Sequence, residues 1–121
     1  MEQETQDWID TNLSKAVYEL MDKGILDDLI VEAKPAWMLP MTLLIGKARV
    51  KGSNADFYWF LCGDAPLMAA DGTVAANPRL AARHFSYQWQ LQLASNEAAD
   101  PEEVQKAESL YALTEMDQYW T

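Results

Sequence analysis

Two apolar runs joined by a short polar loop constrain this chain more than any other part of its sequence. The first run, TLLIGKARV, extends from Thr42 to Val50, and the second, DFYWFLC, ends at Cys62. Both runs are rich in β-branched, aromatic and aliphatic residues, and the GSN sequence between them tolerates positive φ. The stretch therefore predicts a β-hairpin on which the other elements pack.

Alternation along the hairpin predicts how its two faces differ. In the return strand both alternating sets are apolar, so we expect both faces of the sheet to be at least partly covered. One face becomes basic towards the tip, at Lys47, Arg49 and Lys51. Because a two-stranded hairpin is marginally stable alone, a third strand is expected from residues 37–39 or 72–75, or else the hairpin edge pairs with a second copy of the chain.

Helical periodicity predicts the elements on the N-terminal side. Apolar residues from Glu4 to Lys23 recur at helical spacing, and Gly24 is suited to end that helix. Residues 25–34 keep a helical spacing and predict a second short helix, although the sequence IVEA fits a strand equally well. Pro35 and Pro40 then bracket a segment that we interpret as an extended crossing with Trp37 packed inward.

Two further helices are predicted on the C-terminal side. Asn77 and Pro78 form an N-cap and first-turn pair that opens a helix running to about residue 94. Two rows of this helix are predicted to face inward, namely Leu80, His84, Tyr87, Leu91 and Ala81, Phe85, Trp89, Leu93. The sequence Asp-Pro-Glu-Glu at residues 100–103 starts the last helix. The pattern as a whole predicts an α+β fold in a single domain, residues 1–121, with a small antiparallel sheet packed by about four helices.

The charge distribution indicates which partners the chain can bind. Its net charge is −10, and the acids are concentrated in residues 1–34 and 95–121. Such a polyanion disfavours direct binding to nucleic acid and favours a protein partner with a basic surface. Acids mixed with exposed aromatics give a set of candidate partner-binding residues: Trp8, Asp27, Asp28, Glu115, Asp117, Tyr119 and Trp120. The simpler alternative is that the acids keep a small protein soluble and the aromatics close the rim of its core.

Few residues could carry chemistry. The single histidine and single cysteine predict no metal site, and no phosphate-binding glycine motif or cofactor site is recognised. One catalytic arrangement is conceivable, in which His84 acts as a base oriented by Asp64 while Arg79 and Arg83 hold an anion. The simpler interpretation is a core histidine beside solvated arginines. Cys62 lies in an apolar run and predicts a buried, unreactive thiol.

Three features of the sequence, namely its N-terminal residues, its apolar runs and its single cysteine, indicate the cellular location of the protein. Its N-terminal residues are acidic and polar, unlike a secretory signal, and no run approaches the roughly 18 to 20 apolar residues of a membrane span. A single cysteine suits a reducing compartment. We therefore expect a cytoplasmic protein that does not associate with membranes.

Three stretches, KPAWMLPMTLLIGK, FYWFLCGDAP and NPRLAARHFSYQWQL, resemble a family of small uncharacterised bacterial proteins known only as a domain of unknown function. The resemblance covers roughly residues 30 to 93 and implies a bacterial cytosolic protein without implying an activity.

The leading hypothesis for function, which comes from the residues themselves, is an acidic non-enzymatic interaction protein, in its most specific form an inhibitor or immunity protein. The alternatives are a small-molecule or enzymatic site in residues 64–84 and a homodimeric structural protein.

Overall fold

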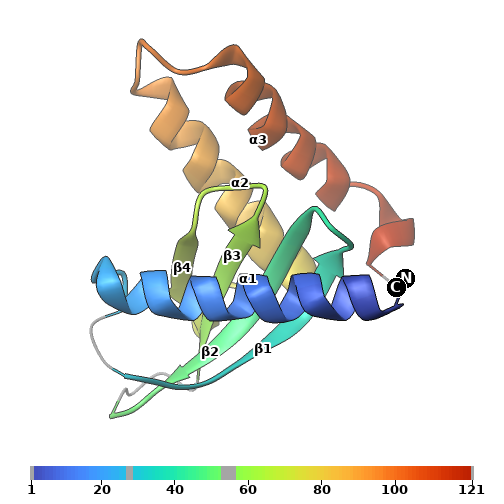
Figure 1. The fold of residues 1–121 in the computed structure, drawn as a ribbon. Helices are drawn as coiled ribbons and strands as arrows, with labels where there is room; N and C mark the ends of the chain where they lie inside the picture. The colour runs from blue at the N-terminus through green and yellow to red at the C-terminus, as the bar shows by residue number, and fades with distance from the viewer. Residues whose placement is uncertain (1, 27–28, 53–56, 121) are drawn as a thin grey trace. The chain divides into compact units, whose positions relative to one another are not determined.

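The predicted hairpin forms the two central strands of an antiparallel sheet (Figure 1). Strand β2 spans Leu43–Val50 and pairs with strand β3, which spans Tyr58–Gly63. Strand β1 (Ile30–Leu39) pairs with the other side of β2, and strand β4 (Met68–Asp71) with the other side of β3. The computed structural model describes residues 2–26, 29–52 and 57–120, so the tip of the hairpin lies outside the described residues.

The chain divides into two compact units, residues 1–74 and 75–121. The first contains helix α1 (Glu2–Asp22), the sheet and a 3₁₀ turn, η1 (Gly72–Val74). The second contains helix α2 (Pro78–Ala94), helix α3 (Pro101–Thr114) and a 3₁₀ turn, η2 (Asp117–Tyr119). The α+β class is confirmed, but the described residues form three α-helices rather than about four. The single-domain organisation stays a prediction.

The second helix predicted over residues 25–34 is wrong for the described residues of that stretch, and the strand alternative for IVEA, residues 30–33, is right; residues 27–28 lie outside the described residues. Residues from Ile30 onward belong to β1, which continues through the segment interpreted as a crossing. Helical spacing over so short an apolar run does not separate the two states, and pairing with β2 decides for the strand. Pro35 is tolerated because β1 lies at the edge of the sheet, where a missing N–H costs little.

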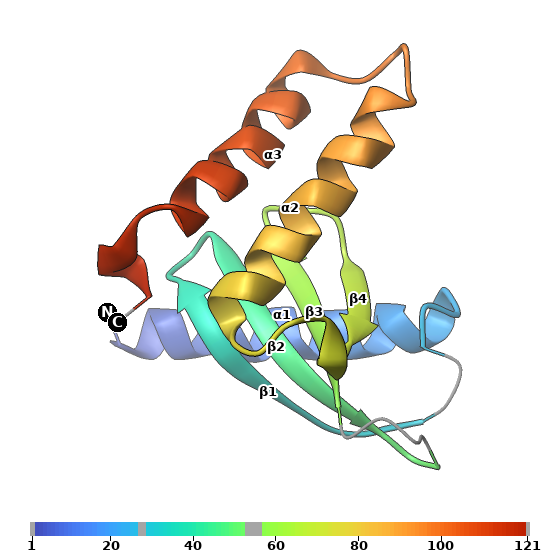
Figure 2. The same ribbon diagram turned by 180° about the vertical axis from the view of Figure 1, so that it is seen from behind.

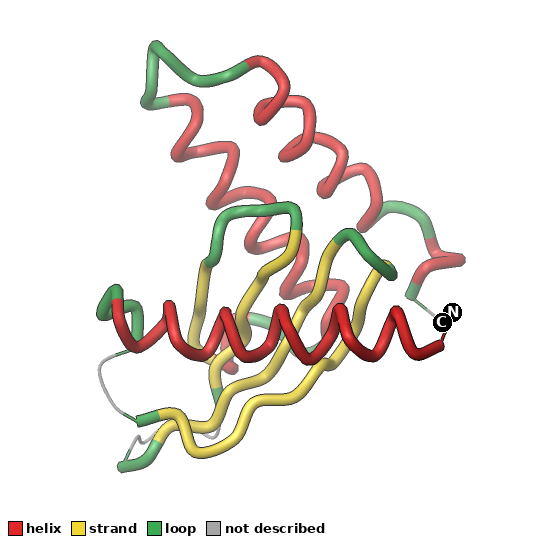
Figure 3. The backbone as a smooth tube through the Cα atoms, viewed as in Figure 1, coloured by secondary structure: helices red, strands yellow, loops and turns green. Residues whose placement is uncertain are grey.

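The order β1-β2-β3-β4 is a simple meander, which the tube in Figure 3 makes easy to follow. The third strand predicted at residues 37–39 is confirmed as part of β1. The alternative strand at residues 72–75 is wrong, because β4 ends at Asp71 and a 3₁₀ turn follows. Both edges of the hairpin are therefore paired within the chain, and a second copy has no hairpin edge to bind.

Helix α1 lies across one face of the sheet (Figure 1). Its periodic apolar residues, including Ile9, Ala16 and Leu20, join Leu44 and Phe60 of the sheet in one buried cluster. The helix ends as predicted beside Gly24, which has φ of +67° and donates its N–H to the Met21 carbonyl. Half-buried residues complete the cluster around its rim: Trp8, Leu13, Val17, Met21, Ala33, Met38, Tyr58, Leu67 and Ala69.

Both faces of the two central strands carry buried side chains, so both are at least partly covered, as the sequence predicts. Phe60 and Leu44 belong to the cluster under α1, while Ile45, Trp59 and Leu61 on the alternate positions are equally buried. The indole N–H of Trp59 donates to the Gly72 carbonyl at 3.2 Å, so this buried ring keeps a hydrogen-bond partner.

Gly46 has no side chain because the ring of Phe60 occupies that space. The two residues are direct cross-strand partners, and a Cβ at Gly46 would lie 2.2 Å from Phe60 Cζ. The glycine therefore permits Phe60, the largest fully buried side chain of the α1 cluster, to pack directly against the neighbouring strand.

Gly46→Ala is expected to lower the free energy of unfolding by about 1–3 kcal/mol, because the added methyl group displaces a packed ring. Urea denaturation measures the change. Adding Phe60→Leu to the same chain should recover part of the loss by freeing the space. A Gly46→Ala variant with an unchanged urea midpoint would contradict this packing argument.

Candidate protein-binding face

Helix α2 is capped by Asn77 at its N-terminus and by Ser95 at its C-terminus. The Asn77 side chain accepts the N–H of Leu80 at 2.9 Å, and Pro78 occupies the first turn. Residues 96–99 connect Ser95 to the N-cap Asp100, whose carboxylate accepts the N–H of Glu102 at 2.9 Å. The two helices contact each other along their length and form an antiparallel hairpin (Figure 2).

Only one of the two rows predicted to face inward on α2 is buried. Ala81, Phe85 and Trp89 are buried, as predicted. In contrast, Leu80, Tyr87 and Leu91 are exposed by 40%, 49% and 65%. These three residues, at i, i+7 and i+11, lie along one side of the helix and are called the exposed α2 row. The prediction that this row faces inward is wrong, because the contacts of α2 leave one side of it in water.

Helix α3 places an acidic row beside the exposed α2 row. The rings of Tyr87 and Tyr111 lie 5.4 Å apart, so the two rows meet at this pair. Glu108 and Glu115 flank Tyr111 at helical spacing and are both exposed. The exposed α2 row together with Glu108, Tyr111 and Glu115 is called the α2–α3 face. It combines apolar side chains with carboxylates on one helical hairpin.

The two arginines predicted to hold an anion are bonded to the end of α3. Arg79 donates from Nε to the Thr114 carbonyl at 2.6 Å and from Nη2 to Asp117 Oδ1 at 2.8 Å. Arg83 donates from Nη2 to the same carbonyl at 3.1 Å and lies 4.0 Å from Glu115. The last carbonyls of a helix attract cations, so both guanidinium groups stabilise the C-terminus of α3. Anion binding by these residues stays a prediction.

The other two predicted catalytic residues belong to different units of the chain. Asp64 belongs to the first unit, where its N–H donates to the Thr42 carbonyl at 2.7 Å. His84 belongs to α2, is half-buried, and contacts the ring of Phe85 edge to face at 5.7 Å. The catalytic arrangement of these two residues stays a prediction.

Several of the predicted partner-binding residues have roles inside the fold. Trp8 packs on the rim of the α1 cluster, and Trp120 donates its indole N–H to the Leu113 carbonyl at 2.9 Å. Tyr119 is 41% exposed at the end of η2. Asp27 and Asp28 lie outside the described residues. The exposed α2 row itself was missed, although its apolar residues at helical spacing are visible in the sequence, because periodicity does not say which of two apolar rows meets the core.

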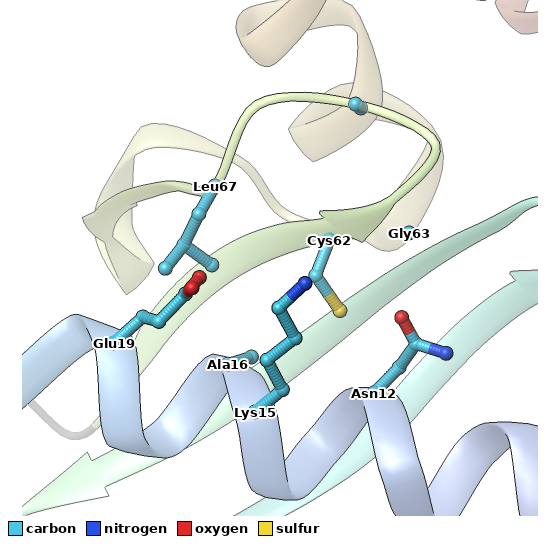
Figure 4. A pocket seen from close by; sticks show the side chains of 8 residues that line it. Asn12, Lys15, Ala16, Glu19, Cys62, Gly63 and Leu67 are labelled. Atoms are coloured by element: carbon cyan, nitrogen blue, oxygen red, sulfur yellow. The ribbon is translucent and has the colours of Figure 1, made fainter.

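Cys62 lines a small pocket between α1 and the loop that follows β3 (Figure 4). The pocket measures about 80 Å³, and Lys15 of α1 extends beside the Cys62 thiol. Burial raises the pKa of Cys62 to about 11, as the apolar position of this residue in the sequence suggests. The remaining lining residues are Asn12, Ala16, Glu19, Gly63, Ala65 and Leu67. A protonated thiol is a poor nucleophile, which favours a structural role for Cys62 over a reactive one.

Two further findings concern the described residues as a group. Across residues 2–26, 29–52 and 57–120, no three His, Cys, Asp or Glu side chains are grouped so that they could hold a metal ion. In the same part of the chain, no helix is long and apolar enough to cross a membrane.

A family model matches residues 2–120, which is nearly the whole chain. The protein belongs to the family called domain of unknown function DUF4826. This family membership confirms the predicted relation to an uncharacterised domain family, and it extends the resemblance well beyond residues 30 to 93. No curated protein and no solved structure matches the chain.

The raised pKa of Tyr111 predicts how the stability of the protein depends on pH. Hydrogen bonds with Tyr87 and then with Glu115 raise its pKa from 10.0 to about 12. Because the pKa of Tyr111 is higher in the folded than in the unfolded chain, the neutral phenol contributes fully to stability below pH 10, the pKa of the unfolded chain. This contribution is lost as the pH rises from 10 through about 12. Tyr111→Phe should therefore flatten the loss of stability between pH 10 and 12 in urea titrations. Tyr18→Phe, an exposed tyrosine on α1, is the control and should leave the wild-type slope unchanged. Equal slopes for wild type and Tyr111→Phe would contradict the bonding described.

The raised pKa of Cys62 predicts slow alkylation of its thiol in the native protein. Because its pKa is raised from 9.0 to about 11, the thiolate fraction at neutral pH falls by about two orders of magnitude. Alkylation by iodoacetamide, followed by mass spectrometry, should be at least that much slower in the native protein than in concentrated urea. Similar rates in both states would show that the thiol is accessible and ionised.

Proposed function

We propose that this protein is a non-enzymatic interaction protein that binds a basic surface of a protein partner through the α2–α3 face. The observation that supports this function is the exposed α2 row of Leu80, Tyr87 and Leu91 lying beside the carboxylates of α3. Apolar and aromatic side chains supply most of the binding free energy at protein interfaces, whereas surrounding charges set orientation and association rate.

The charge of the second unit fits a cationic partner. Residues 95–121 hold seven acids and one lysine. The nearest arginines, Arg79 and Arg83, already bond to Thr114, Asp117 and Glu115, so their charge is partly neutralised within the unit. A partner that brings lysines or arginines therefore meets an excess of carboxylate around the apolar row, and its approach is accelerated electrostatically.

The most specific form of this proposal is an inhibitor or immunity protein that masks the cationic site of a toxin. In that role the α2–α3 face would fill the space used by an anionic substrate, and a high association rate would be advantageous. A cytoplasmic location belongs to the same proposal, because such an inhibitor acts where the toxin would otherwise act.

The test compares full-length variants as immobilised baits at low salt. Wild type is expected to retain a discrete basic protein, identified by mass spectrometry, whose affinity falls steeply as salt is raised. Leu91→Ser and Glu108→Lys should each weaken binding about ten-fold or more, since both alter the α2–α3 face. Tyr18→Ser is the matched control, because Tyr18 on α1 is as exposed as Leu91. This variant should bind as wild type does.

The folding of each bait is checked by circular dichroism before capture, so that lost binding is separated from lost structure. Retention that is unchanged in Leu91→Ser and Glu108→Lys would overturn the assignment to the α2–α3 face. The absence of any basic protein retained by the wild type at low salt would overturn the proposed function itself.

A further inference from the structure

The outer side of β1 is an open sheet edge. β1 ends the strand order on that side, and its residues from Val31 to Ala36 are exposed except for the half-buried Ala33. The apolar side chain of Val31, for example, is 49% exposed. Strands at a sheet edge present backbone N–H and C=O groups that a further strand can pair with.

The charges along this edge are incompletely paired. Ala33 and its partner Ala48 pack in the α1 cluster, so Glu32 and Lys34 point to the opposite face. Glu32 pairs with Arg49 at 3.6 Å, whereas Lys34 is directly opposite Lys47, a like charge. Like charges in direct cross-strand positions are unfavourable. Among the described residues, no carboxylate lies within ion-pair distance of Lys34.

Lys47, the cross-strand neighbour of Lys34, lies over two aromatic rings. Its ammonium group lies 4.6 Å from the ring centroid of Phe57 and 5.0 Å from that of Trp59. Within the described part of the chain, Lys34 therefore offers a positive charge without a carboxylate partner at the open edge, two residues from the exposed carboxylate of Glu32. An antiparallel strand carrying the same pair of charges in reverse order would complement both.

We infer that β1 pairs with β1 of a second copy of this chain, antiparallel about a two-fold axis at Ala33. This register places Glu32 opposite Lys34 of the second copy, and the symmetry creates the pair twice. A groove between α1 and β1, lined by both apolar and polar residues, lies beside the axis at Ala33, so the two grooves adjoin. Its lining residues are Leu13, Ser14, Val17, Ile30, Val31, Glu32 and Ala33.

Local irregularities limit how far this pairing extends. The register of β1 shifts between Ile30 and Glu32 and again between Pro35 and Trp37, and Pro35 lacks an N–H. The regular stretch is therefore short, and the two-fold axis leaves no open edge at the new interface. The product is a reversible dimer that depends on concentration, and it does not require the α2–α3 face.

Analytical ultracentrifugation over a concentration series tests this inference on the full chain. Wild type should dimerise reversibly, and Lys34→Glu should weaken the dimer about ten-fold, because two attractive pairs become repulsive. Glu32→Lys should do the same. The double variant Glu32→Lys with Lys34→Glu should restore wild-type affinity, because both pairs form again with their charges exchanged.

Lys34→Glu is the more informative single variant, because Glu32→Lys also removes the ion pair with Arg49. Glu97→Lys, an exposed residue of the second unit, changes net charge as Glu32→Lys does and should leave the dimer unchanged. Urea titrations check that every variant folds. A wild type that stays monomeric throughout, a dimer that Lys34→Glu does not weaken, or a double variant that does not recover would each overturn the inference.

Discussion

The burial of large apolar side chains on both faces of β2 and β3 is the constraint on which the rest of the structure depends. Phe60 faces the α1 cluster while Trp59 and Leu61, on either side of it, are buried on the other face. Burial of a large apolar side chain contributes about 1.5–3 kcal/mol, so neither face can be left open without a large loss of stability. The position of α1, the glycine at residue 46 and the meander all follow from covering these strands.

At least four of the nine lysines and arginines of this acidic protein have partners within the fold. Arg79 and Arg83 bind the C-terminus of α3, Arg49 pairs with Glu32, and Lys47 lies over aromatic rings. The carboxylates are more numerous than these cations, and many remain in water. The negative surface therefore results from composition together with the internal use of positive charge, which is the physical basis for expecting a cationic partner.

Much of the fold was predictable because its signals are local. The hairpin, the Asn77 and Asp100 caps, the Gly24 helix end and the buried thiol at Cys62 each depend on residues that lie close in sequence. The candidate site was less predictable. Arg79 and Arg83 were recognised as a pair, but their bonds to Thr114 join residues more than thirty positions apart, and no periodicity or capping rule reports such a contact.

The sequence by itself determined the class of the fold, the hairpin at its centre, the helix boundaries and the segregation of charge, because propensity, capping and alternation act over a few residues. Tertiary structure alone decided that residues 30–34 are strand and that Leu80, Tyr87 and Leu91 remain in water. The first outcome depends on pairing with β2, and the second depends on which side of α2 packs against its neighbours. An apolar row fits a core or a partner equally well, and only the arrangement of the folded chain selects between them.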